Sequence, residues 1–125
     1  MIELTDRDEI EQKIKEEGDY KGFVYHYVAC EIKRIEGMGH LCGYLHLDSV
    51  TEDAREIINE HFHCGITYEH DDVYGFDCTQ VGDINPKYLH VDNFYYWHNE
   101  TYKTMAYVER CLKNAIDGLV EKGML

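Results

Sequence analysis

Apolar and polar residues alternate along much of the first two thirds of this chain, a pattern typical of β-strands with one buried face. Between residues 22 and 35 one parity is apolar and the other carries charge, so we expect a single half-buried strand there. Its apolar positions are Val24, Val28, Cys30 and Ile32. A turn at Gly37-Met38-Gly39 follows, and leucines then alternate with polar residues up to Asp48, which predicts the partner strand of an antiparallel hairpin.

A second hairpin is predicted from residues 65–69 and 73–79, which flank a turn at His70-Asp71-Asp72. Residues 88–97 are rich in aromatic side chains and predict either another strand or an aromatic loop. The alternating segments together predict an antiparallel sheet, or sheets, of about five to six strands.

Helical periodicity predicts three helices. Thr5 caps a short first helix that Gly18 ends. Ser49 or Thr51 caps a mid-chain helix, which has apolar positions at Ala54, Ile57, Ile58 and Phe62. From 101 to 122, apolar residues recur at three- and four-residue steps, which predicts a long amphipathic helix with part of its face packed on a second subunit. We therefore expect a single α+β domain over residues 1–125.

Acidic residues dominate the charged positions, with 25 Asp and Glu against 12 Lys and Arg and a formal net charge of −13. Such a chain repels DNA, RNA and anionic membranes, because binding to them depends on neutralising phosphates. The sequence has no run of about 20 apolar residues to span a membrane, and its N-terminus lacks the basic and apolar segments of a leader. We therefore expect a soluble, cytoplasmic protein whose partners are neither membranes nor nucleic-acid polymers.

Five cysteines and eight histidines raise the question of a metal site. The densest cluster is His61-Phe62-His63-Cys64, but no C-x-x-C pair occurs and the other cysteines are isolated on predicted strands. Structural zinc sites use paired ligands on two separate elements. We therefore expect reduced, mostly buried thiols, no metal and no cofactor.

A catalytic site would need a nucleophile or base that a third group orients. The candidates for such roles are Asp77, Asp83, His26, His46 and His90. No nucleophile elbow, phosphate loop or paired-histidine helix motif fixes their geometry. We therefore expect a binding protein rather than an enzyme and assign no catalytic residue.

The ribbon from His63 to Asp83 is the strongest candidate for a ligand site. It places Phe76 beside Asp77 and ends in a turn at Gly82-Asp83, so an aromatic face, a carboxylate and backbone N–H groups would converge. Arg110 lies between apolar positions of the last helix, and its guanidinium either reaches out to water or binds phosphate oxygens.

The aromatic run Phe94-Tyr95-Tyr96-Trp97 has two interpretations. Aromatic residues usually fill cores or subunit interfaces. A polar aromatic loop near Asn85 also suits a clamp that stacks on a nucleobase.

Several blocks of the sequence resemble a family of small phage proteins, over roughly residues 27 to 119. One block runs from Cys30-x-Ile32-x-Arg34 into Gly39-His40-Leu41-Cys42-Gly43-Tyr44. Another runs from Gly65-Ile66-Thr67-Tyr68 to Gly75-Phe76-Asp77-Cys78-Thr79-x-x-Gly82-Asp83. The segment from Tyr102 to Leu119, with Tyr107-Val108, is similar as well. Gln80 and the start His63-Cys64-Gly65 depart from the family pattern, which puts the choice of ligand in doubt.

The resemblance is to the Thoeris anti-defence proteins, which bind glycocyclic ADP-ribose signals and withhold them from the immune effector without cleaving them. It implies a cytoplasmic protein of the infected bacterial host, working as a homodimer or higher homo-oligomer, with a small cyclic nucleotide as its partner. On this assignment Phe76 stacks on the base, Asp77 and Asn85 bind ribose or base edges, and Arg110 binds phosphate. Phe94, Tyr107 and Arg55 complete the expected ligand-binding residues.

Two alternatives from other classes stay open. One is a metal-dependent cyclic-nucleotide hydrolase that uses Asp77 and Asp83. The other is a structural or interaction protein with no small ligand, in which the aromatic run is an interface.

Overall fold

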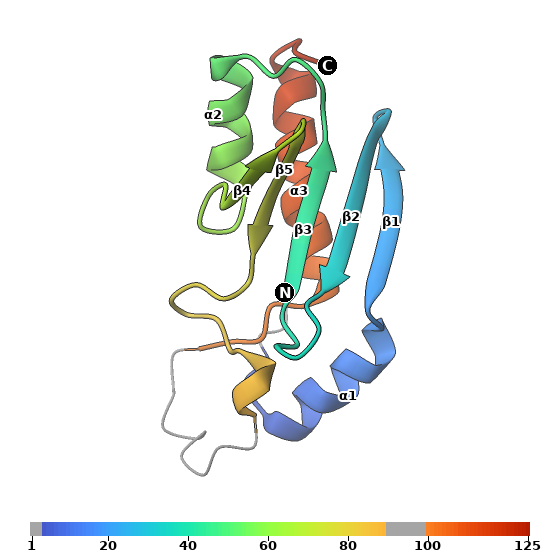
Figure 1. Ribbon diagram of the computed structural model, residues 1–125, viewed down its shortest axis with the longest axis vertical. Coiled ribbons are helices and arrows are strands. Elements are labelled where there is room, and N and C mark those ends of the chain that lie inside the picture. Colours follow the sequence, from blue (N-terminus) through green and yellow to red (C-terminus); the bar gives the residue numbers. More distant parts are fainter. Residues whose placement is uncertain (1–3, 90–99) are drawn as a thin grey trace.

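The computed structural model describes residues 4–89 and 100–125, and within these ranges five antiparallel strands form one sheet in the order β1-β2-β3-β5-β4 (Figure 1). The strands are β1 (Tyr20–Tyr25), β2 (Val28–Arg34), β3 (Leu41–His46), β4 (Tyr68–His70) and β5 (Val73–Asp77). The helices are α1 (Arg7–Glu17), α2 (Glu52–His61) and α3 (Met105–Glu121), with a 3-10 turn η1 (Pro86–Tyr88). The predicted α+β fold, with an antiparallel sheet and a C-terminal helix, is confirmed.

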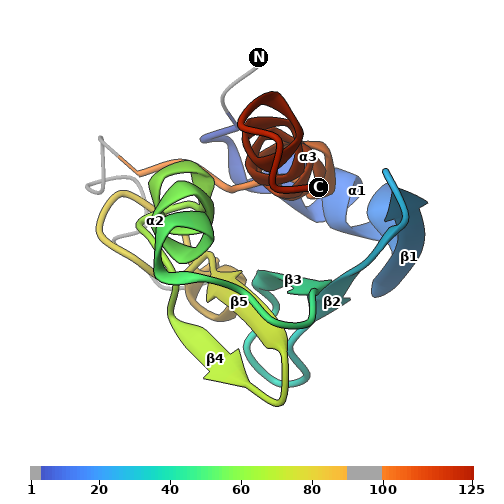
Figure 2. The same cartoon turned by 90° about the horizontal axis from the view of Figure 1, so that it is seen from above.

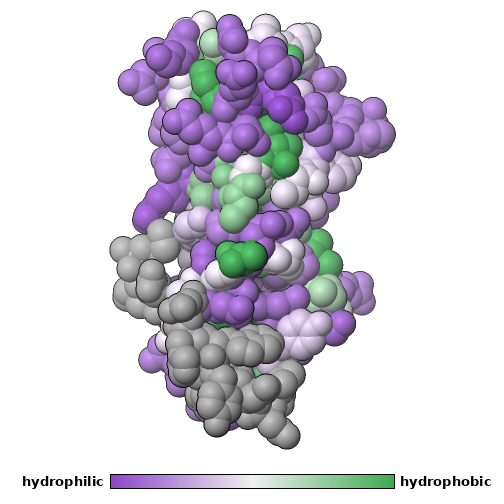
Figure 3. Space-filling model, turned by 90° about the vertical axis from the view of Figure 1, so that its left-hand side faces the viewer, coloured by the Kyte–Doolittle hydropathy of each residue, from purple (hydrophilic) through white to green (hydrophobic). Residues whose placement is uncertain are grey.

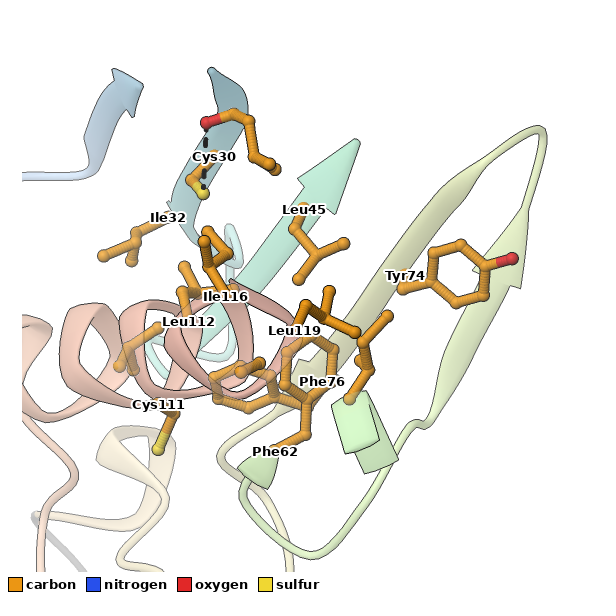
Figure 4. Packing of buried hydrophobic residues seen from close by; sticks show 14 of the residues in the cluster. Cys30, Ile32, Leu45, Phe62, Tyr74, Phe76, Cys111, Leu112, Ile116 and Leu119 are labelled. Carbon is orange, nitrogen blue, oxygen red and sulfur yellow. Dashed lines mark hydrogen bonds between the residues drawn. The ribbon is translucent and has the colours of Figure 1, made fainter. Parts of the chain in front are cut away.

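Helices α2 and α3 cover one face of the sheet, and α1 lies at one end of it (Figures 1 and 2). The main core fills the space between the sheet and these two helices, with Ile32, Leu45, Leu112 and Leu119 fully buried (Figure 4). Ile58 of α2 is fully buried as well. None of the helices in the described residues lies on the opposite face of the sheet (Figure 2). The fold is therefore a two-layer arrangement with one uncovered sheet face.

The prediction of one strand over residues 22–35 is wrong. His26 and Tyr27 form a tight turn with φ angles of 47° and 66°, and the chain reverses into β2. The reversal changes the face on which the two valines lie, so that Val24 is 70% exposed while Val28 is 2% exposed. The predicted hairpin across residues 37–39, by contrast, is confirmed by the antiparallel pairing of β2 with β3.

Helices α1, α2 and α3 each begin after a residue whose side chain caps the helix by accepting a backbone hydrogen bond. Asp6, and not the predicted Thr5, caps α1 by accepting a hydrogen bond from the Glu9 N–H, and Gly18 ends the helix as predicted. Thr51 is the cap of α2, which settles the choice between the two predicted residues. Thr104 caps α3, so this helix begins four residues later than position 101.

The apolar stripe of α3 is used inside its own subunit. Its buried residues are Met105, Val108, Cys111, Leu112, Ala115, Ile116 and Leu119, all of which pack in the main core. The outward positions are polar or small, such as Ala106, Arg110, Asn114 and Asp117. The expected packing of this apolar face on a second subunit is therefore not supported.

A smaller core joins α1 to the residues on either side of η1 and to the segment that leads into α3. Ile10, Ile84, Leu89 and Tyr102 are its buried members. Above it, the Arg34 guanidinium donates to the Gly18 and Gly39 carbonyls, to the Tyr102 hydroxyl and to Glu17 Oε1. Glu17 in turn accepts from the Met105 N–H at 2.6 Å and so ties α1 to the start of α3.

The aromatic segment predicted over residues 88–97 is described only at its beginning. Tyr88 closes η1 and Leu89 is buried in the smaller core. Residues 90–99, which include Phe94 and His90, lie outside the described ranges.

Candidate functional site

Four polar side chains from separate parts of the chain meet beside the main core, and we call them the polar cluster: His63, Asp83, Lys103 and Tyr107. His63 follows α2, Asp83 ends the loop after β5, and the other two residues flank the start of α3. Their convergence joins the two ends of the ribbon 63–83 to the C-terminal helix.

The four side chains of the polar cluster contact one another directly. His63 Nε2 lies 2.7 Å from Asp83 Oδ2, and His63 Nδ1 lies 2.6 Å from the Tyr107 hydroxyl. Lys103 Nζ forms an ion pair with Asp83 Oδ1 at 3.1 Å. The Asp83 carboxylate is 1% exposed and the His63 side chain 9%, so the contacts are almost fully removed from water.

Local backbone features bring Asp83 to this position. Its Oδ2 accepts a hydrogen bond from the Gln80 N–H at 3.0 Å, which closes the turn that leaves β5. Gly82 takes a φ of 94° in that turn, a conformation that favours glycine. The Ile84 N–H then donates to the Thr101 carbonyl, so the loop is fixed against the segment that leads into α3.

Burial favours the neutral form of the Tyr107 hydroxyl. It raises the pKa of the Tyr107 hydroxyl well above its ordinary value, and the Cys111 thiol adds to this effect. The Tyr107 hydroxyl is therefore neutral in its hydrogen bond with His63, and Asp83 and Lys103 form an oppositely charged pair.

An aspartate bonded to a histidine is the arrangement that orients a general base. In this molecule the second histidine nitrogen, Nδ1, is already bonded to Tyr107. Both imidazole nitrogens are thus occupied by protein groups. The polar cluster is suited to holding the loop 80–87 in place, and it offers no free nitrogen to a substrate.

Asp77 is occupied in the same way by its own neighbours. Its carboxylate accepts hydrogen bonds from the Thr67 hydroxyl, from the N–H and hydroxyl of Thr79, and from the Gln80 amide. Burial raises the pKa of this carboxyl, but these donors outweigh it and the net pKa is lowered. Asp77 therefore organises the turn after β5.

Phe76 is a core residue. Its side chain is 1% exposed, and its ring packs on that of Phe62 with 4.8 Å between centroids (Figure 4). It also lies over Gly43, where an added Cβ would be 2.9 Å from the ring. The prediction that Phe76 stacks on a ligand is wrong for this conformation, because strand alternation points it inward while Asp77 points to the other face.

The other predicted binding residues lie apart from one another. Asn85 caps η1 by accepting from the Lys87 N–H at 3.1 Å. Arg110 is exposed on α3 and borders a groove of about 730 Å³ against α1. Arg55 pairs with Glu69 of β4 at 2.8 Å. Phe94 lies outside the described residues, and Tyr107 alone belongs to the polar cluster.

A larger depression, which we call the hairpin groove, lies where the β2–β3 turn meets α1 and η1. Its volume is about 890 Å³. Helix α1 contributes Glu11, Ile14 and Lys15, the β2–β3 turn contributes Ile35, Glu36, Met38 and Gly39, and the η1 region contributes Pro86, Lys87 and Leu89. Gly39 has a φ of 86°, and an added Cβ would lie 2.8 Å from the Pro86 Cβ, so the turn and η1 are in close contact.

The charges of the hairpin groove differ in availability. Arg34 borders it, but its side chain is 8% exposed and all five of its N–H groups already have protein acceptors. Lys15 of α1 and Lys87 of η1 are exposed and line the groove. The groove thus combines apolar walls with two accessible cations and with three carboxylates, those of Glu11, Asp19 and Glu36.

The polar cluster and the hairpin groove are linked through the chain. Residues 83–87 lead from Asp83 of the polar cluster to Lys87 of the groove. His40 directly follows Gly39, which lines the groove. His40 is 8% exposed, and burial lowers its pKa while Asp77 and Asp83 oppose that shift. Contacts that fix Asp83 therefore also fix one wall of the groove.

Metal and thiol chemistry have little support within residues 4–89 and 100–125. No three His, Cys, Asp or Glu side chains in these ranges are grouped as a metal site requires. Four of the five cysteines are buried and all five are free thiols. Burial raises the pKa of Cys42 to about 11, which makes this thiol a poor nucleophile.

The sequence gives no signal for Lys103, and it marks His63 as part of a possible zinc cluster and as the start of the ribbon 63–83 without predicting its partners. The pairs His63–Asp83 and His63–Tyr107 are separated by 20 and 44 residues. No local spacing marks such contacts, so only the turn at Gly82-Asp83 gave a signal.

Comparisons of the chain with protein-family models, with curated proteins and with solved structures find no match. None of the helices in the described ranges has the length and apolar character needed to cross a membrane.

Proposed function

We propose that this protein binds and sequesters a cyclic ADP-ribose-type immune signal without cleaving it, acting as a phage anti-defence protein in the cytoplasm of an infected bacterium. The observation that carries the proposal is the hairpin groove of about 890 Å³, which Lys15 of α1 and Lys87 of η1 both line. Ligand sites typically have volumes of about 300–1,000 Å³ and mostly apolar linings.

The groove matches the parts of such a ligand. A cyclic ADP-ribose isomer presents a purine face, ribose hydroxyls and a pyrophosphate. Ile14, Met38 and Pro86 offer apolar walls for the purine, the two lysines offer charge for the pyrophosphate, and Glu11 and Glu36 border the groove as acceptors for hydroxyls.

Two features favour binding without cleavage. Both nitrogens of His63 are bonded to protein groups, and the carboxylates of Asp77 and Asp83 are engaged by several donors each. A hydrolase would need one of these groups free to activate water. The described residues also contain no metal-ligating group of three, which leaves the metal-dependent hydrolase without a supporting observation.

Ligand-induced stabilisation tests the proposal. The melting temperature of the protein should rise with a cyclic ADP-ribose isomer, because saturation at 100-fold above Kd adds about 2.7 kcal/mol to the folded state. Lys87→Glu should weaken binding about tenfold or more by calorimetry, whereas Lys122→Glu, an exposed lysine at the end of α3, should not. Absence of any shift with the wild-type protein would point to an interaction protein with no small ligand.

A further inference from the structure

Strand β1 forms one edge of the sheet, and among the described residues only β2 pairs with it. The Arg34 N–H donates to the Asp19 carbonyl at 2.9 Å, so these two residues form a hydrogen-bonded pair of the β1–β2 ladder. Because such pairs alternate along an antiparallel ladder, Tyr20, Gly22 and Val24 direct their backbone N–H and C=O groups away from β2. These groups are placed to pair with an added strand.

The opposite edge of the sheet is protected, whereas the β1 edge is not. Strand β4 has only three residues, and its Glu69 is paired with Arg55 at 2.8 Å. The side of the molecule on which β4 and α2 lie is predominantly hydrophilic (Figure 3). Strand β1 has six residues, no proline and a single charge, and its Val24 is 70% exposed. Short strands, charges and prolines protect edges against added strands, so β1 is the edge that accepts one.

A groove of about 600 Å³ lies between β1, α1 and α3, and we call it the β1 groove. Its lining holds four of the chain's 12 Lys and Arg residues and three carboxylates. The cations are Lys13, Lys21, Arg110 and Lys113, and the carboxylates are those of Glu17, Glu109 and Asp117. The β1 groove therefore has an excess of positive charge in a chain whose net charge is −13.

The carboxylates of the β1 groove already have partners. Glu109 forms ion pairs with two lysines of the groove. Asp117 accepts a hydrogen bond from the Tyr25 hydroxyl at 2.7 Å. Glu17 pairs with Arg34, which lies outside the lining. These acids leave little negative charge to attract a basic partner.

Lys13 of α1 and Arg110 of α3 are the cations available to a partner. Within residues 4–89 and 100–125 neither side chain has an ion-pair partner. A guanidinium binds a carboxylate through two parallel hydrogen bonds. Salt screens charges beyond about 8 Å at physiological ionic strength, so the lining of the groove outweighs the more distant acidic surface.

We propose that an extended acidic segment of a partner protein adds to β1 as a further strand. Its backbone pairs with Tyr20, Gly22 and Val24 at about 4.8 Å from β1. Phe23 and Tyr25 pack on the main core, so side chains of the added strand on their side point toward the helices and the β1 groove. Every second residue of the segment is therefore an aspartate or glutamate, and the residues between them are apolar, beside the exposed Tyr20 and Val24.

A second copy of the chain does not meet these requirements. In a two-fold pairing of β1 with β1, the β1 grooves of the two copies would lie side by side and their cations would repel. The only charged residue of β1 is Lys21, so the strand brings no carboxylate to the groove. The β1 groove also shares no lining residue with the hairpin groove, so this inference does not depend on the proposed ligand.

Peptide binding measured by calorimetry tests the inference. A peptide of about eight residues in which valine alternates with glutamate should bind the wild-type protein, and one in which valine alternates with lysine should not. Val24→Pro removes an outward N–H and keeps the β1–β2 hydrogen bonds, so it should bind about tenfold or more weakly than Val24→Ala. Arg110→Glu should likewise bind about tenfold or more weakly than Lys122→Glu, at an exposed lysine after α3.

N-methylation of the peptide tests the same backbone contact without changing the protein. Methyl groups on one alternate set of peptide nitrogens should abolish binding, and methyl groups on the other set should leave it unchanged. Circular dichroism checks that the protein variants keep the fold.

Failure of the wild-type protein to bind the valine–glutamate peptide would overturn the proposal. Equal effects of the two N-methylated sets would overturn it, because the peptide would then not lie as a strand. Equal binding by Arg110→Glu and Lys122→Glu would exclude the β1 groove as the site of the acidic side chains. Self-association of the wild-type protein that Val24→Pro abolishes would replace the acidic segment with a second copy.

Discussion

His63 Nε2 and Asp83 Oδ2 lie 2.7 Å apart, although twenty residues separate them in the sequence. The contact joins the end of α2 to the loop after β5, and Lys103 approaches the other carboxylate oxygen at 3.1 Å. Because residues 83–87 continue directly into the wall of the hairpin groove, this buried pair determines where Lys87 is held.

Replacing Asp83 by asparagine should destabilise the protein strongly. The substitution leaves the Lys103 charge, in a side chain that is 16% exposed, beside a neutral amide. Breaking a buried ion pair from one side costs about 3 kcal/mol or more of the free energy of unfolding. Urea denaturation measures the loss, with Asp48→Asn, at an exposed aspartate, as the control. Equal stability of the two variants would mean that the polar cluster holds nothing in place.

Phe76→Leu separates a core role from a ligand-binding role. We expect the free energy of unfolding to fall by about 1–2 kcal/mol, because the smaller side chain leaves the Phe62 ring partly unpacked. The affinity for a cyclic ADP-ribose isomer, measured on folded protein by calorimetry, should stay within about twofold. A folded variant that binds about tenfold more weakly would restore Phe76 as a stacking residue.

His40 should make the stability depend on pH on the acidic side. Burial lowers the pKa of His40 below its ordinary value of 6.5, with Asp77 and Asp83 opposing the shift. Below pH 6.5 the unfolded chain therefore binds a proton that the folded chain does not, so the free energy of unfolding falls as the pH falls. Denaturation of wild type and His40→Gln at about pH 8 and pH 5.5 measures this, and the variant should lose less stability. Identical losses would show that His40 does not titrate differently in the two states.

Much of the fold follows from local patterns, and the exceptions have physical causes. Leu41, Leu45 and the stripe of α3 are buried as their spacing predicts. The reversal between β1 and β2 was missed because His26 and Tyr27 adopt positive φ without the Gly or Asn that usually marks such a turn. Strand alternation implies that Phe76 and Asp77 face opposite sides, and the prediction that both converge on one ligand overlooked it.

The candidate site was less predictable than the fold because its parts are distant in sequence. Lys15, Met38 and Lys87 come from a helix, a hairpin turn and a 3-10 turn, and only tertiary packing brings them to one groove. Tyr107 was predicted to bind the ligand directly, but the structure bonds its hydroxyl to His63. Isolated side chains of this kind have no periodic signal in the sequence.

A ligand-retention experiment tests the central claim most directly. The protein is incubated with a cyclic ADP-ribose isomer, unbound ligand is removed, the complex is denatured, and the mass spectrum of the released molecule is recorded. The account predicts that the protein retains the isomer and releases it with its mass unchanged, and that Lys87→Glu retains less of it than Lys122→Glu. Release of a ring-opened product, or failure of the wild-type protein to retain any ligand, would contradict it.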